Sequence, residues 1–190
     1  METLKKIYYR VYQNAFKLAM PLLPWRKPEL LEGAGSIRRV PEVLNKLQIN
    51  NVLIVTDAML MQLGLLDSLI KALEENKCQY AIFDQTVPDP TIENVEDALK
   101  MYHQHGCKAI IAFGGGSPMD CAKIVGARVA KPNKPVEKMK GVLKVIVKIP
   151  TLIAVPTTAG TGSEVTLAAV ISNAATMEKY PINDFCLIPH

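Results

Sequence analysis

The sequence has no long hydrophobic run. A membrane-spanning helix needs about 20 consecutive apolar residues, and no stretch of the 190 residues approaches that length. The N-terminal stretch IYYRVYQNAFKLAM is broken by Arg10, Gln13, Asn14 and Lys17, so it also lacks the apolar centre of a signal peptide. We therefore expect a cytoplasmic protein that does not associate with membranes.

Cysteines are few and are not spaced for metal binding or redox chemistry. The four of them, Cys78, Cys107, Cys121 and Cys186, form no CxxC pair. In a chain of this length without a secretory signal, the spacing predicts buried reduced thiols and argues against a disulfide framework.

A block of charge of one sign is also missing. The net charge is +4 and basic residues alternate with acidic ones, so nothing indicates a nucleic-acid partner. Hydrophobic residues make up 49% of the chain and charged residues 21%. This composition is typical of a globular protein with a substantial core.

Four apolar runs alternate with helical patterns from residue 51 onward. The runs lack polar alternation, which is typical of parallel strands buried on both faces, and their alternation with helices predicts an α/β layered domain. We expect strands within 51–57, 79–85, 107–116 and 151–158, and helices within 65–77, 91–106 and 117–130. The polar, proline-rich stretch 131–141 is expected to be a mobile connection.

Residues 3–19 have the apolar spacing of an amphipathic helix. Its predicted apolar face consists of Leu4, Ile7, Tyr8, Val11, Tyr12, Ala15 and Phe16. Pro21, Pro24 and Pro28 are expected to end the helix. Such a helix can lie on a membrane surface or pack on its own domain or a sister subunit; the aromatic face and low charge favour packing. We place the helix and its proline-rich linker at 1–28 and the α/β domain at 29–190.

The stretch AFGGGSPMDCAK, residues 112–123, joins the third apolar run to a helix. Ser117, Pro118 and Asp120 suit a helix start, with the serine as cap, the proline in the first helical position and the aspartate as the acid of a capping box. Lys123 is expected to pair with Asp120 at the i, i+3 spacing.

The helix start does not explain Gly114, Gly115 and Gly116, because three glycines cost backbone entropy and add no packing. They do let a charged group approach the main chain, and the free N–H groups of a helix N-terminus favour phosphate. We expect a phosphate cradle here; the alternative is a tight turn before a well-capped helix. The usual fingerprints are absent, since neither GxGxxG nor the GK[ST] of a P-loop occurs.

A second loop rich in small residues, PTTAGTGSEVT at 156–166, follows the fourth apolar run. Ligands of open α/β sheets bind outside the carboxyl ends of the strands, so we expect this loop beside the glycine turn. Thr157 and Thr158 offer hydroxyls, and Gly160 and Gly162 offer room. The alternative is a turn with no ligand.

Asp57 ends the first apolar run and should reach the same edge of the sheet. A carboxylate there can accept a hydrogen bond from a ribose 2′-hydroxyl and would repel the 2′-phosphate of NADP. This predicts NAD, with NADP less favoured. The alternative is a helix cap for the residues that follow.

Taken together, these motifs resemble the iron-containing, group III alcohol dehydrogenases. The matching stretches are GGGSPMDCAK, PTTAGTGSEVT, VTDAML and DQTVPDPTIENV, and the resemblance covers residues 28–190. It implies a dehydroquinate synthase-like α/β domain that binds NAD(P), followed by a helical domain that holds a divalent metal.

The resemblance also implies roles for single residues. Gly115, Gly116 and Ser117 would hold the pyrophosphate, with Gly114 before them and Asp120 close by. Thr157, Thr158 and Thr161 would flank the cofactor, Thr166 and Val170 would lie near the nicotinamide, and Lys179 would reach the nicotinamide ribose. Asp57 matches the position that favours NAD. Asp89 departs from the pattern, because it replaces an asparagine that contacts the cofactor.

The implied chemistry is hydride transfer between nicotinamide and an alcohol carbon, with the metal as Lewis acid. The family's ligands are one aspartate and three histidines from the helical domain. This chain has only His103, His105 and His190. The first two would point about 200° apart on a helix and are expected at the surface. We expect Fe²⁺ or another divalent metal in a full-length parent only, and no metal site or known catalytic residue here.

The stretch FCLIP before His190 looks like a strand in mid-fold, so we expect the chain to be a fragment of a longer enzyme. The predicted function is the NAD(P)-binding portion of a metal-dependent alcohol dehydrogenase or aldehyde reductase, inactive alone and forming a homodimer or larger homo-oligomer. Its substrate would be a small alcohol or aldehyde. The alternatives are a glycerol dehydrogenase-like or dehydroquinate synthase-like enzyme, or a non-catalytic nucleotide-binding module.

Overall fold

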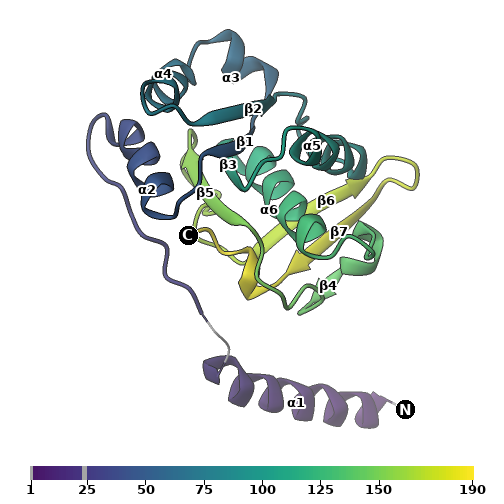
Figure 1. Ribbon diagram of the computed structural model, residues 1–190. Coiled ribbons are helices and arrows are strands. Elements are labelled where there is room, and N and C mark those ends of the chain that lie inside the picture. Colours follow the sequence, from purple (N-terminus) through teal and green to yellow (C-terminus); the bar gives the residue numbers. More distant parts are fainter. Residues whose placement is uncertain (1, 23–24) are drawn as a thin grey trace.

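A parallel four-stranded sheet forms the centre of the fold in the computed structural model, which describes residues 2–22 and 25–190 (Figure 1). Its strands are β1 (Asn51–Val55), β2 (Gln79–Phe83), β3 (Ala109–Gly114) and β5 (Thr151–Pro156), in the order β2-β1-β3-β5. The four strands predicted from the apolar runs are confirmed. In the register, Val55 pairs with Ala112 and Gly114 with Pro156, so the carboxyl ends of the strands share one edge.

Helices cover both faces of this sheet (Figure 1). On one face, α5 (Ile92–Gln104) and α6 (Gly116–Ala130) pack on Leu53 and Val55 of β1. On the other, α2 (Val40–Lys46) and α4 (Asp67–Glu75) pack on Val52 and Ile54. Successive side chains of a strand point to opposite faces, and the central strands β1 and β3 are buried on both faces, which is why they read as unbroken apolar runs.

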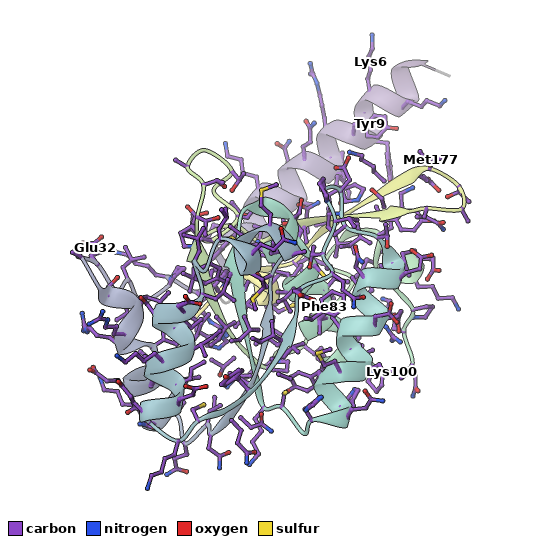
Figure 2. All side chains as sticks on the ribbon, turned by 90° about the horizontal axis from the view of Figure 1, so that it is seen from above. Lys6, Tyr9, Glu32, Phe83, Lys100 and Met177 are labelled. Carbon is purple, nitrogen blue, oxygen red and sulfur yellow. The ribbon has the colours of Figure 1, made fainter. Side chains whose placement is uncertain are left out.

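A second, smaller sheet was not predicted. In it, β6 (Ala168–Asn173) and β7 (Glu178–Asn183) form an antiparallel hairpin, and β4 (Gly141–Val142) runs parallel to β7. Figure 2 shows Met177 at the tip of this hairpin. The hairpin packs on α6 through buried residues such as Ala169 and Ile171.

The end of the hairpin contradicts one expectation. The stretch FCLIP forms a 3₁₀ helix, η4 (Phe185–Leu187), where a strand was expected. The cause is the fully buried Asp184, whose carboxylate accepts from the N–H groups of Val145 at 2.9 Å, Ile146 at 3.0 Å and Cys186 at 3.3 Å. These bonds turn the chain before a strand can form.

The stretch 131–141 is more closely packed than its composition suggests. It contains a 3₁₀ helix, η3 (Val136–Met139), and both Val136 and Met139 are buried in the core next to α6. The two apolar side chains anchor a segment that otherwise consists of polar residues, prolines and a glycine. All four cysteines are buried free thiols, as predicted.

The N-terminal helix α1 (Glu2–Ala19), followed by η1 (Met20–Leu22), lies apart from the α/β layers in Figure 1. The predicted helix is confirmed, and its face is largely exposed at Ile7, Tyr8 and Val11. The Tyr8 and Tyr12 rings stack on each other with centroids 6.5 Å apart. Pro24, one of the residues expected to end this helix, lies outside the described residues. None of the described helices is long and apolar enough to cross a bilayer. Packing of this helix on a sister subunit stays a prediction.

Candidate nucleotide-binding site

The glycine turn sits where β3 leads into α6. Gly114 ends the strand with φ +146°, and a Cβ built there would lie 2.7 Å from Pro118 Cγ and 3.1 Å from Leu60 Cδ1. Only glycine tolerates both this backbone conformation and this contact. The strand therefore enters the helix without a connecting loop, and the helix N-terminus faces the carboxyl edge of the sheet.

The predicted capping box at this turn is wrong. The helix begins at Gly116 with Gly115 as its N-cap, and no side chain of the described residues bonds at that cap. Because Gly114 lets the helix start early, Ser117 is already helical and cannot act as the cap. Asp120 accepts instead from the Val170 N–H of β6, with Oδ2 2.9 Å from the nitrogen. Burial raises the pKa of Asp120, against the opposing effects of that bond and of Lys123.

The second loop lies over the glycine turn, as predicted. The Thr157 N–H donates to the Gly114 carbonyl at 3.0 Å. A Cβ on Gly115 would come within 3.0 Å of Thr158 Oγ1, and one on Gly116 within 3.4 Å of Thr161 Cγ2. The side chains of Thr158 and Thr161 thus lie close to Gly115 and Gly116. The two loops form one site with hydroxyl groups and main-chain amides close together.

Asp57 reaches the same edge and acts as a helix cap. Its Oδ1 accepts from the Leu60 N–H at 3.0 Å at the start of α3 (Ala58–Gln62). The capping alternative is therefore observed. A carboxylate has four lone-pair sites on two oxygens, so a cap of this kind still leaves acceptor capacity for a ligand hydroxyl.

The remaining predicted residues lie on or next to the β6–β7 hairpin. Val170 is 37% exposed, and its N–H binds Asp120. Lys179 extends towards the turn before α5, where its Nζ lies 2.9 Å from Asp89 Oδ1. The Ser172 N–H donates to the Pro90 carbonyl at 2.8 Å and holds the same two segments together.

The predicted ion pair between Lys123 and Asp120 is not formed within the described part of the chain. Its Nζ lies 2.8 Å from the carbonyl oxygens of both Thr166 and Ala168, and 3.3 Å from Thr166 Oγ1. Burial lowers the pKa of Lys123 to about 8, although Asp120 and Glu164 act in the opposite direction. The sequence contains one signal of this burial, because Lys123 lies among apolar residues of α6.

None of the histidines makes a hydrogen bond to the glycine turn or to the second loop within the described residues. His103 and His105 are exposed, as predicted. His190 Nδ1 accepts from the Leu152 N–H at 3.1 Å and lies 2.9 Å from Arg26 Nη1. Burial and the neighbouring cations Arg26 and Lys148 lower the pKa of His190 to about 4. Within the described part of the chain, no three His, Cys, Asp or Glu side chains gather closely enough to hold a metal ion.

A model of the iron-containing alcohol dehydrogenase family matches residues 28–190. The chain belongs to that family. This confirms the resemblance carried by the two loop motifs and accounts for the parallel sheet.

Individual members of the iron-containing alcohol dehydrogenase family agree with this assignment. An aldehyde-alcohol dehydrogenase of Streptococcus pneumoniae is 42% identical over 153 residues, covering 74% of this chain and 17% of that protein. The NAD-dependent methanol dehydrogenase of Bacillus methanolicus is 35% identical over 162 residues, covering 85% and 42%. A solved structure of 1,3-propanediol oxidoreductase superposes with a TM-score of 0.82 at 33% identity, covering 87% of this chain and 43% of that one. The chain thus spans less than half the length of these relatives.

Proposed function

We propose that this chain is the NAD-binding portion of a metal-dependent alcohol dehydrogenase or aldehyde reductase. The observation that supports it best is the start of α6, where Gly114 and Gly115 precede the helix and Gly116 is its first residue, with no side-chain cap among the described residues and the threonine loop over it. A helix N-terminus of this kind attracts a diphosphate through its N–H groups and its dipole.

The proposed roles follow from position. The main-chain amides of Gly115, Gly116 and Ser117 bind the diphosphate. Thr158 and Thr161, within contact range of the glycines, supply hydroxyls around it.

The second part of the proposed site lies farther along the same edge. Thr157 and Thr166 frame the cofactor at the two ends of the second loop, and Val170 and Lys179 lie on the nicotinamide side. Asp57 accepts from the ribose 2′-hydroxyl with the oxygen that does not cap α3, which favours NAD over NADP.

The proposal places no metal ion on this chain. The described residues lack a set of ligands that fits a divalent ion, so no step of the reaction is assigned to a metal on this chain. The bound cofactor would supply hydride chemistry, and this chain's residues would bind and orient it. We expect the 190-residue chain alone to bind NADH and to produce no NADH from an alcohol.

A fluorescence titration with NADH and NADPH tests this proposal. We expect saturable NADH binding that is tighter than NADPH binding. Gly115→Ala should weaken NADH binding because its Cβ would lie 3.0 Å from Thr158 Oγ1, and Thr158→Ala in the same chain should restore part of the affinity. Ser68→Ala, at an exposed position of α4, is the control. No binding of either cofactor would contradict the proposal, and tighter NADPH binding would contradict the role of Asp57.

A further inference from the structure

Lys123 is a lysine without exposed surface, two turns into α6. Lysines are almost never fully buried unless they are paired. Its amine donates to the short stretch 166–168, where the second loop leads into β6, and the acceptors are the Thr166 and Ala168 carbonyl oxygens and Thr166 Oγ1. Lys123 therefore connects α6 to this stretch with three hydrogen bonds.

That stretch is one end of the loop above the glycine turn. The other end is fixed where the Thr157 N–H donates to the Gly114 carbonyl. Between these two attachments, Thr158 and Thr161 lie against Gly115 and Gly116. The Leu167 carbonyl in this stretch also accepts from the Asp184 N–H at 3.0 Å, so the stretch is held by the small sheet as well as by α6. Releasing Lys123 would remove its attachment to α6, which places the loop hydroxyls over the turn.

The carboxylates of Asp120 and Glu164 act electrostatically on the ammonium group of Lys123. Asp120 precedes it by one turn of α6 and is bonded to the Val170 N–H, while Glu164 belongs to the loop itself. Glu164 Oε2 is buried without a hydrogen-bond partner among the described residues. Both carboxylates would repel an anion at the start of α6, and the buried cation of Lys123 offsets part of that repulsion.

We propose that Lys123 is a positioning residue of the nucleotide site, which holds the loop 157–166 over the glycine turn and neutralises Asp120 and Glu164 beside it. This inference rests on the proposed function, because the ligand served is the diphosphate of the nicotinamide cofactor. Lys123 acts through the loop and makes no contact with the reacting atoms.

Two measurements on Lys123→Met and Lys123→Ala test the proposal. The NADH dissociation constant should rise roughly tenfold, since hydrogen bonds from a charged donor are lost. In the unliganded chain, hydrogen–deuterium exchange should speed up in peptides covering residues 157–168 and stay unchanged in β1 and α5. Lys100→Met, at an exposed position of α5, is the matched control and should alter neither quantity.

Chemical rescue separates a charged clamp from simple packing. In Lys123→Ala, added propylammonium should restore NADH affinity in a concentration-dependent way, because it returns an ammonium to the space of the deleted side chain. The neutral alcohol 1-propanol should not. Unchanged affinity and exchange in both variants would overturn the proposal, and so would equal rescue by the alcohol.

If neither variant folds, the wild-type chain decides the question. Its peptides covering 164–168 should exchange far more slowly than the exposed hairpin tip at 174–177, and equal rates would refute the clamp. Failure of the wild-type chain to bind NADH would contradict the proposed function and the role of Lys123 in it, while the exchange rates would still judge the clamp on their own.

Discussion

Asp89 and Lys179 form an ion pair that joins the turn before α5 to the β6–β7 hairpin, with 2.9 Å between Oδ1 and Nζ. The two residues are 90 positions apart in the sequence. Asp89 adopts a left-handed conformation with φ +56°, which asparagine and aspartate tolerate better than most residues. The ion pair therefore engages Lys179, which the proposed function assigns to the cofactor ribose.

Asp89→Asn should release Lys179 and tighten NADH binding. Both side chains are more than half exposed, and pairs of this kind contribute less than about 1 kcal/mol, so we expect roughly a twofold to fivefold gain in affinity with little change in stability. The measurement is an NADH titration at low and high salt, with the exposed Glu75→Gln as control. Weaker binding by Asp89→Asn would show that Asp89 helps to hold the cofactor.

Gly114→Ala should strongly destabilise the fold. The new Cβ would clash with Pro118, and the alanine backbone would have to adopt φ +146°. We expect a loss of about 3 kcal/mol or more in the free energy of unfolding. Gly33→Ala separates the two causes, because Gly33 has φ +104° and nothing within 4 Å of its Cβ position. Urea unfolding of both variants is the measurement. Equal losses would mean that the contact with Pro118 is unimportant.

Asp184→Ala should destabilise the small sheet and its connections. Three main-chain N–H groups lose their acceptor in a buried site, which costs about 3 kcal/mol. Asp97→Ala, at an exposed position of α5, should be nearly neutral in the same urea titration. A similar small effect for both variants would argue that water replaces the carboxylate of Asp184.

His190 should make stability depend on pH below neutrality. Its pKa is lowered from 6.5 to about 4 in the folded chain, so between these values the unfolded chain binds a proton that the folded chain does not. The stability due to neutral His190 is thus complete above about pH 6.5 and is lost progressively as the pH falls towards 4. Urea unfolding of wild type and His190→Gln should be measured at several pH values. As the pH falls, the free energy of unfolding of the wild type should decrease relative to that of the variant. A constant gap would contradict this.

The main sheet could be predicted from the sequence because its strands are buried on both faces. The run of β3, from Ala109 to Gly114, is entirely buried, and the glycines at its end mark the turn into α6. The β6–β7 hairpin could not be predicted in this way, because β7 contains Pro181 and forms no apolar run, with only Tyr180 and Ile182 buried. Because β7 lies between β4 and β6, a rule that confines proline to edge strands counts against the strand that is observed.

The site could be predicted only in part. The two loops were expected at one edge, which follows from parallel topology alone. The contacts of Lys123 with Thr166 and Ala168 and the pairing of Asp89 with Lys179 depend on how the hairpin folds back on α6. Local spacing favoured an Asp120–Lys123 pair and a capping box, and tertiary contacts prevailed over both.

A crystal of this chain soaked with NADH tests the central proposal most directly. We expect the diphosphate within hydrogen-bonding distance of the main-chain nitrogens of Gly115, Gly116 and Ser117, with the threonine loop closed over it. A fully occupied cofactor bound elsewhere, or a glycine turn that stays empty at saturating NADH, would contradict the account.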